Sequence, residues 1–253
     1  AISTITSIVA GNFVDVSTWD CNCIPDTDEH VVVNHDVTLN MNYSQNENRE
    51  FTVNSGNTLT IQTSYSLAIA GELSNSGTLI GKLKLNGTSA QTPVLGSLES
   101  LEVDNSAGVT IYANLDISGA LKLSDGVLNL NGNSLTLKSS SSSSALIENN
   151  GGTISGALTI ERYVPQGGNG HHYLSTPMSN SLLSELSDDF SFNLSGAYPN
   201  LYYYNEPSSS WVTPSSAGDA MVLGKGYTGY FSGGVIVDIS GIPNSGATNV
   251  ALT

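Results

Sequence analysis

The feature that most constrains this fold is a series of three-residue segments, most of which place one polar residue between two apolar residues. Alternation with a period of two is typical of a short strand with one buried face. Glycine, asparagine and serine separate the segments, and helical spacing is nearly absent. The segments are 31–33, 37–39, 51–53, 59–61, 67–69, 83–85, 101–103, 109–111, 121–123, 128–130, 135–137 and 158–160.

The segments also recur at a longer period. Leu39, Leu59, Leu79, Leu101 and Leu121 are separated by 20, 20, 22 and 20 residues. A period near twenty is typical of one coil of a solenoid, and coils must stack because a single coil cannot bury its own apolar face. We predict an all-β chain with an N-terminal cap at 1–30, a right-handed parallel β-helix at 31–162 and a small β-rich, sandwich-like module at 163–253. A β-sandwich of short hairpins is the alternative for the repeat.

The charge balance excludes several classes of partner. The chain has 22 acidic and 7 basic residues, for a net charge of −15, so nucleic acid and an anionic membrane surface would repel it. No apolar run reaches the roughly 18–20 residues needed to span a bilayer, so we expect no membrane insertion. Low lysine, abundant serine, threonine and asparagine, and few cysteines fit a secreted or cell-surface protein.

The region after residue 190 differs from the repeat because aromatic residues are concentrated there: it holds Tyr198, Tyr202, Tyr203, Tyr204, Trp211, Tyr227, Tyr230 and Phe231. Exposed tyrosines suit weak carbohydrate contacts through ring stacking and hydrogen bonds, and Tyr202, Tyr204 and Trp211 are the candidate ligand-binding residues. Apolar spacing at 181–187 predicts one short helix. The serine run at 139–144 interrupts the repeat and predicts a loop that protrudes from one coil.

The stretch "STWDCNCIPDTDEHVVVNHDVTLN" resembles the opening of repeat-rich, adhesin-like secreted surface proteins of Bacteroidetes-type bacteria. In that family such a stretch starts a parallel β-helix, and the resemblance implies that Trp19 covers the open end of the stack. Cys21 and Cys23 stand where glycines are often seen in the family. The matching residues are Ser17, Trp19, Pro25, Asp28, Val31, Val33, His35, Val37, Thr38 and Leu39.

Three later segments, "ERYVPQGGNGHHYLSTPM", "LYYYNEPSSSWVTPSS" and "LGKGYTGYF", resemble segments found in the same order in this family. The resemblance implies a small β-rich domain after the helix. It also implies export by a type IX system, for which large members use a separate C-terminal sorting domain. We expect the chain to be part of a longer protein.

Two further sets of side chains near the N-terminus suggest chemistry. Asp15, Asp20, Asp26 and Asp28 are the candidate ligands of a calcium ion, which takes six to eight oxygen ligands, although no calcium-loop motif is present. Cys21 and Cys23 either form a small-ring disulfide or stay reduced. Two cysteines alone cannot make a four-ligand zinc site.

Catalytic motifs are absent from the sequence. His171 and His172 are adjacent, so in an extended segment they point to opposite sides and do not readily bind one metal. We therefore expect a non-catalytic adhesin or scaffold segment with no obligatory cofactor, whose partner is a surface polysaccharide or another surface protein. The alternative is a polysaccharide-binding or polysaccharide-degrading β-helix, for which a groove lined by carboxylates would be the sign.

Overall fold

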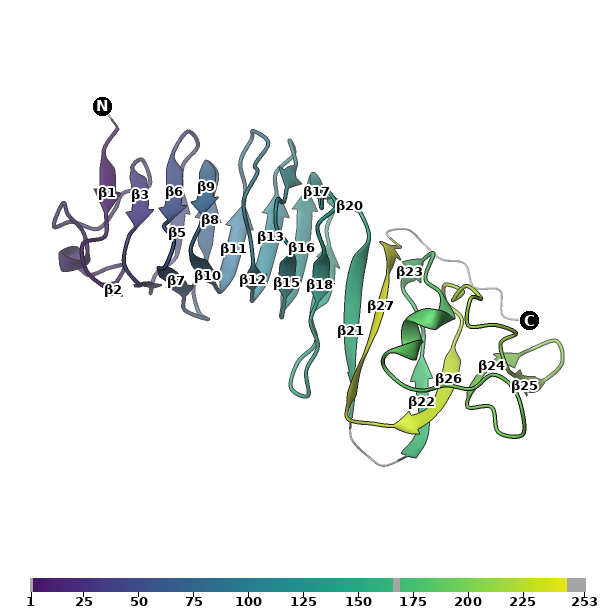
Figure 1. The fold of residues 1–253 in the computed structure, drawn as a ribbon. Helices are drawn as coiled ribbons and strands as arrows, with labels where there is room; N and C mark the ends of the chain where they lie inside the picture. Colours follow the sequence, from purple (N-terminus) through teal and green to yellow (C-terminus); the bar gives the residue numbers. More distant parts are fainter. Residues whose placement is uncertain (1, 166–168, 245–253) are drawn as a thin grey trace. The chain divides into compact units, whose positions relative to one another are not determined.

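The computed structural model describes residues 2–165 and 169–244, and the fold is all-β with extensive parallel pairing. The helices among these residues are two short 3-10 turns, η1 (Val16–Thr18) and η2 (Leu183–Ser187). The chain forms two compact units (Figure 1). The first unit runs to residue 135 and includes 145–156, and the second comprises 136–144 and the chain from 157 onward.

Parallel sheets build the first unit, and consecutive strands of the chain belong to different sheets. Three sheets start near the N-terminus, and Figure 1 shows their strands in successive layers. Sheet I contains β1 (Thr4–Thr6), β3 (His30–Val33), β6 (Glu50–Val53) and β9 (Glu72–Asn75). Sheet II contains β2 (Gly11–Asn12), β4 (Val37–Leu39), β7 (Thr58–Ile61) and β10 (Thr78–Ile80). Sheet III contains β5 (Tyr43–Gln45), β8 (Leu67–Ile69), β11 (Lys82–Leu85), β13 (Ser100–Asp104), β16 (Ala120–Asp125) and β19 (Leu146–Asn149).

Shorter pairings continue the same pattern in the later coils. The strands β14 (Val109–Thr110), β17 (Val127–Asn129) and β20 (Thr153–Ser155) form one parallel sheet, and β12 (Ser97–Leu98) pairs with β15 (Leu115–Ile117). Each of these strands therefore pairs in parallel with a strand that lies further along the chain.

Register places the apolar residues of neighbouring strands opposite one another. In sheet I, Val31 pairs with Phe51 and Phe51 pairs with Leu73, and all three are buried. The leucine series is only partly aligned, because Leu59 pairs with Leu79 but Leu39 pairs with Ile61. Leu79 belongs to sheet II and Leu101 to sheet III, so the near-constant spacing of that series crosses between sheets.

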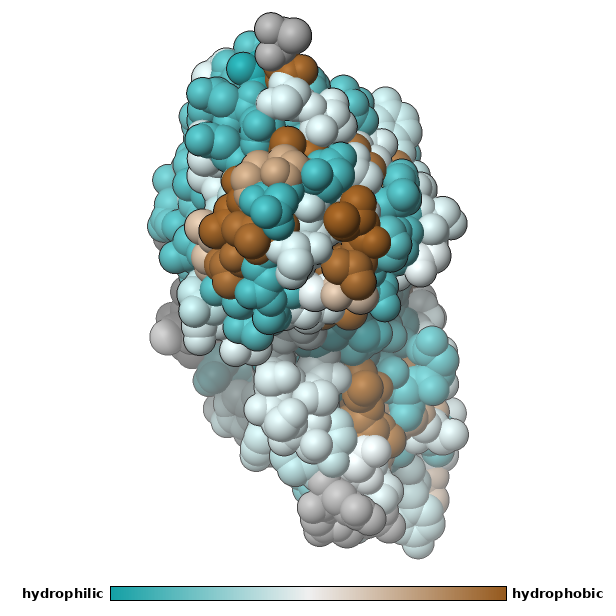
Figure 2. All heavy atoms as spheres, turned by 90° about the vertical axis from the view of Figure 1, so that its left-hand side faces the viewer, coloured by the Kyte–Doolittle hydropathy of each residue, from teal (hydrophilic) through white to brown (hydrophobic). Residues whose placement is uncertain are grey.

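Aromatic side chains cover the N-terminal end of the first unit. Trp19 is 1% exposed, its Nε1–H donates to the Phe13 carbonyl oxygen at 2.8 Å, and its ring lies 5.0 Å from the Phe13 ring. The Phe13 ring in turn lies 4.8 Å from that of Tyr43. Figure 2 shows that the outer face of this end carries separate apolar patches among polar surface. Its exposed large apolar residues include Ile8, Val9, Val16 and Ile24.

Antiparallel pairing distinguishes the second unit. The strand β21 (Leu158–Val164) pairs with β27 (Val235–Pro243), which also pairs with β23 (Met178–Ser179). A four-stranded sheet, sheet IV, has the order β22 (Asn169–Leu174), β26 (Tyr227–Ser232), β24 (Leu201–Asn205) and β25 (Ser210–Val212). The serine run forms a tight hairpin in which Ser139 and Ser144 pair. The short helix expected at 181–187 is the turn η2, which begins after Leu182 without a side-chain cap.

Candidate functional site

An aromatic pocket of about 390 Å³ lies on sheet IV. Residues at alternate positions of a strand share one face, which is why His171 and Tyr173 of β22 both reach this pocket. Tyr173 and Tyr202 each pair with Thr228, so the three form one row across β22, β26 and β24. The pocket is lined by His171, Tyr173, Tyr202, Trp211 and Thr228.

The pocket combines exposed rings with a few fixed polar groups. Tyr173 is 79% exposed and Trp211 is 53% exposed, so both rings are available to a ligand. The Tyr202 hydroxyl donates to the Pro199 carbonyl oxygen at 2.5 Å, and the Thr228 hydroxyl lies 3.3 Å from His171 Nδ1. A concave site with aromatic walls and a small number of polar groups is typical of small-ligand binding.

The structure brings the three predicted aromatic residues to the same face of sheet IV. Tyr202 and Trp211 line the pocket, whereas Tyr204 supports it, because its ring packs edge-on against Trp211 at 5.5 Å. Sequence reasoning missed Tyr173, and it considered His171 only together with His172 as an unsuitable metal-binding pair. Alternation along 171–173 predicts that His171 and Tyr173 share a face. Placing that face beside Tyr202 also requires the antiparallel register of sheet IV, which the sequence did not reveal.

His172 occupies the opposite face of the same strand. Its ring lies 4.5 Å from that of Phe231, whereas the His171 ring lies 5.1 Å from that of Tyr230. Lys225 is on a neighbouring turn, with its Nζ 3.1 Å from the centre of the Tyr203 ring. Burial lowers the pKa of Lys225, and the contact with the ring face stabilises its charge.

A second concavity, a polar groove of about 520 Å³, lies on the first unit beside sheet I. It is built from segments far apart in the sequence, because its lining comes from His30 and from segments 47–50, 70–72 and 89–92. Gly71 is required here, since an added Cβ would lie 2.0 Å from the Arg49 carbonyl oxygen. The Thr88 backbone N–H donates to Glu47 Oε1 at 2.6 Å, which joins the loop of a later coil to this segment. The side-chain and backbone hydrogen bonds from Thr88 lower the pKa of Glu47.

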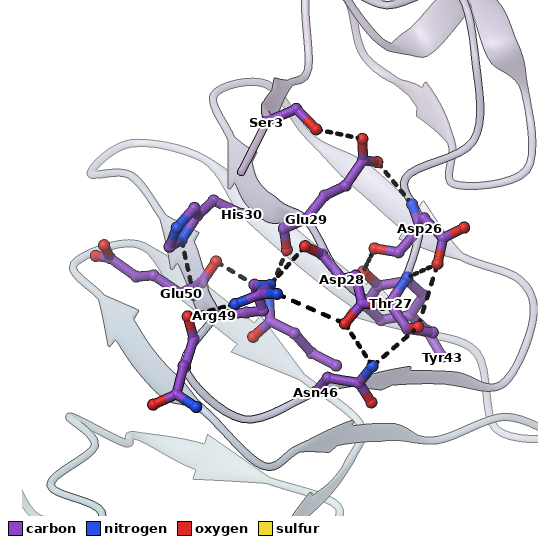
Figure 3. Close-up of polar contacts among 12 residues, drawn as sticks. Ser3, Asp26, Thr27, Asp28, Glu29, His30, Tyr43, Asn46, Arg49 and Glu50 are labelled. Carbon is purple, nitrogen blue, oxygen red and sulfur yellow. Dashed lines mark hydrogen bonds and ion pairs between the residues drawn. The ribbon is translucent and has the colours of Figure 1, made fainter. Parts of the chain in front are cut away.

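Hydrogen bonds fix the side chains at one end of this groove (Figure 3). Arg49 Nε donates to the Asp28 carbonyl oxygen at 2.5 Å, and its Nη2 lies 3.7 Å from Asp28 Oδ1. The Glu50 backbone N–H donates to His30 Nδ1 at 2.9 Å. Because Nδ1 accepts this bond, a neutral His30 carries its proton on Nε2.

The four aspartates predicted as calcium ligands each have a separate partner. Asp15 accepts from Asn12, Asp20 from the Thr6 backbone, Asp26 from Thr27, and Asp28 from Asn46. Within residues 2–165 and 169–244, no group of three or more histidine, cysteine or acidic side chains is placed to hold a metal ion. The calcium site therefore stays a prediction from sequence that no such group supports.

Cys21 and Cys23 are joined by a disulfide. The Cys23 backbone N–H also approaches the Cys21 sulfur at 3.1 Å, so the bridge closes a tight turn directly after Trp19. Of the two alternatives left open by the sequence, the structure has the paired form.

Acidic side chains gather around β27 in the second unit. Asp189 accepts a hydrogen bond from the Asp238 backbone N–H at 2.9 Å, and Glu185 accepts one from Ser240 at 2.9 Å. Burial is the main cause that raises the pKa of Asp189 to about 6; the hydrogen bond from the Asp238 N–H lowers it, and the nearby charges of Asp238, Asp188 and Glu161 raise it. Burial and neighbouring carboxylates also raise the pKa of Asp238. Lys138 forms an ion pair with Glu161 in this region.

Comparison with protein-family models, with curated proteins and with solved structures finds no match to this chain. The functional argument therefore depends on the geometry of the two concavities. In the described part of the chain, none of the helices has the length and apolar character needed to cross a membrane.

Proposed function

We propose that this chain is a non-catalytic segment of an extracellular cell-surface adhesin or scaffold, built on a right-handed parallel β-helix, and that it contacts carbohydrate through the aromatic pocket of sheet IV. In-register parallel strands repeated over successive coils support the β-helix. A disulfide supports an oxidising compartment outside the cell. Export by a type IX system rests on the family resemblance alone.

The single observation that carries the carbohydrate contact is the pairing of exposed rings with fixed polar groups in one pocket. Trp211 offers a ring face that a pyranose can cover with its C–H groups, while His171 and Thr228 offer hydrogen-bonding atoms beside it. Among the described residues, no acidic side chain lines this pocket, which favours a neutral sugar over a cationic ligand.

Tryptophan fluorescence tests the proposal because the chain has only two tryptophans. Trp19 is 1% exposed in the first unit, so a change on adding sugar reports on Trp211. A glycan array selects the saccharide, and isothermal titration calorimetry, which needs no tryptophan reporter, then measures its affinity for the wild type and the variants. We expect Trp211→Ala to weaken binding at least about tenfold, equal to about 1.4 kcal/mol. Tyr198→Ala is the matched control, since Tyr198 is 86% exposed and does not line the pocket.

A silent array, or equal binding by the Trp211 and Tyr198 variants, would remove the carbohydrate contact from the proposal.

The groove on the first unit favours a second candidate function, a polysaccharide-degrading β-helix. Glu47, Glu50 and Glu72 all line it, and glycoside hydrolysis needs two suitably spaced carboxyl groups. A reducing-sugar assay on acidic and neutral polysaccharides separates the two candidates. New reducing ends that disappear in Glu50→Gln would favour the enzyme, and none would favour the scaffold.

A further inference from the structure

Three aromatic residues form a diagonal line across sheet IV, which we call the ring line: Tyr230 of β26, Tyr202 of β24 and Trp211 of β25. Tyr202 pairs with Thr228, which is two residues before Tyr230. Trp211 pairs with Tyr204, which is two residues after Tyr202. Each step along the ring line therefore moves one strand across and two residues along, and diagonal neighbours of this kind are about 7–8 Å apart.

The ring line continues beyond the aromatic pocket, because Tyr230 is not part of the pocket lining. Tyr230 is 45% exposed and Trp211 is 53% exposed, so both ends of the line are open to solvent. Each end is also held by a neighbouring ring: His171 lies 5.1 Å from Tyr230, and Tyr204 lies 5.5 Å from Trp211. Rings that are already held in place lose little conformational freedom when a ligand stacks on them.

The side of sheet IV that carries the ring line differs in charge from the rest of the chain. Every described side chain that the four strands place on the same side as Thr228 is aromatic, histidine, serine or threonine. The whole chain, in contrast, has 22 acidic and 7 basic residues. Among the described strand residues on this side, no carboxylate, lysine or arginine is present to attract an ion, which favours an uncharged ligand.

We propose that the ring line binds a linear, uncharged polysaccharide, and that Tyr230 is a binding residue outside the pocket. This inference rests on the proposed carbohydrate contact and adds the length of the ligand to it. The two diagonal steps together span about 14–16 Å, which is longer than a single sugar ring. A short saccharide bound at Trp211 would therefore leave Tyr230 uncovered, whereas a longer chain would cover all three rings.

A proline-rich peptide is the other polymer that binds to surface aromatic residues, as in domains that recognise polyproline II helices. Such a peptide needs slots between rings for its proline side chains. Here the rings beside both ends of the line are packed edge-on at 5.1 and 5.5 Å, so no slot for a proline ring is left between them. The hydroxyl group of Thr228 and the ring nitrogens of His171 lie beside the line and suit sugar hydroxyl groups.

Isothermal titration calorimetry with saccharides of two lengths tests the proposal. The probes are the disaccharides and hexasaccharides of β-1,4-linked glucose and of β-1,4-linked mannose, with decaproline as the peptide. We expect the hexasaccharide of at least one series to bind about tenfold more tightly than its disaccharide, because it reaches a further ring. Equal affinities for the two lengths would overturn this inference but leave the carbohydrate contact in place. No binding by either series would overturn both, and tighter binding of decaproline would identify a peptide site instead.

A change at Tyr230 should affect only the longer ligand. We expect Tyr230→Ala to weaken the hexasaccharide about fivefold or more and to leave the disaccharide almost unchanged. Trp211→Ala should weaken both lengths. Tyr112→Ala is the matched control, because it removes a ring that is 58% exposed from the first unit and should retain both affinities. Equal weakening of both lengths by Tyr230→Ala would mean that Tyr230 only supports His171 in the pocket, and would overturn its role as a binding residue.

If Tyr230→Ala does not fold, the amide chemical shifts of the wild-type protein replace it. The amides of 229–232 should shift on adding the hexasaccharide but not the disaccharide, and an equal response to both would refute the longer site.

Discussion

Sheets I and III each stack charged, outward-facing residues in register, which we call an outward column, and the two columns differ in their pattern of charge sign. Parallel, in-register pairing places equivalent outward residues of neighbouring strands against one another. Because like charges in such positions repel, charged residues there must alternate in sign or be compensated by other groups. Sheet III alternates Lys84, Glu102 and Lys122, and Asp104 is also paired with Lys84 at 2.7 Å. Sheet I stacks Glu50 on Glu72 beside a groove. The difference teaches that in-register stacking of charged residues is favourable only where opposite charges alternate.

The largest expected effect comes from the interior on which both columns depend. Leu101 points inward from β13 and is 0% exposed, whereas its neighbour Glu102 points outward. Leu101→Ala should lower the free energy of unfolding by about 2–5 kcal/mol, because it removes buried methyl groups and leaves a cavity. Urea unfolding followed by circular dichroism measures this, with the exposed Ser106→Ala as control. A loss for Leu101→Ala no larger than that for Ser106→Ala would contradict the stacked interior.

Alternation of apolar and polar residues predicts which face of a strand is buried, and this is the part of the architecture that the sequence could predict. The buried faces of 31–33, 51–53 and 101–103 followed directly from apolar residues at every second position. The sequence separation of paired strands did not follow, because turns absorb insertions: Leu67 pairs with Leu83, but Leu121 pairs with Ile147 after the serine hairpin has lengthened the connection. A mean period of twenty therefore predicts stacking but not which leucines meet.

Residues of the candidate sites could be predicted to lie together only where they belong to one strand. Tyr202 and Tyr204 share a face by alternation, but Tyr173 and Thr228 join them through antiparallel register that no local pattern encodes. The outward column of sheet I beside the groove was also not predicted from the sequence. His30, Glu50 and Glu72 are 20 and 22 positions apart, so each one separately gave no sign of a shared surface.

The balanced column of sheet III should lose stability when its central charge is removed. Burial pushes the pKa of Glu102 upward, but hydrogen bonds from Lys122, Ser124 and Lys84 outweigh it and keep that pKa below its usual range. Stability from Glu102 is therefore present near neutral pH and is lost as pH falls through the lowered pKa. Glu102→Gln should cost about 1 kcal/mol at pH 7 and less at high salt. Thermal unfolding at two salt concentrations measures it, and a salt-independent cost would show that the ion pairs do not matter.

The carboxylates around β27 differ from Glu102, because the pKa values of Asp189 and Asp238 are raised whereas that of Glu102 is lowered. The pKa of Asp189 is raised to about 6, so its proton is held more tightly in the folded state than in the unfolded state. The second unit should therefore gain stability as pH falls through about 6, and lose it again as pH rises through that value. Asp189→Asn keeps an acceptor for the Asp238 N–H and should raise stability at pH 7.5 by about 1 kcal/mol, once solvent screening is allowed for.

The check on Asp189 is a pair of unfolding curves at pH 5 and pH 7.5. The variant should show a smaller difference between the two than the wild type. Asp219→Asn is the control, because hydrogen bonds from Ser215 and Ser216 lower the pKa of Asp219 and leave it ionised at both values. An unchanged pH dependence in Asp189→Asn would mean that this carboxyl does not titrate in the range.

The smallest expected effect distinguishes the two columns most clearly, because the change in the free energy of unfolding should have opposite signs in sheet I and sheet III. Glu72→Gln removes one of two like charges in register and, without ligand, should raise the free energy of unfolding by about 0.2–0.5 kcal/mol. Glu102→Gln changes the same functional group in the other outward column and should lower it. Unfolding of both variants at low salt measures the pair, and the gain for Glu72→Gln should disappear as salt screens the repulsion. Destabilisation by Glu72→Gln would mean that Glu72 already has a favourable electrostatic environment.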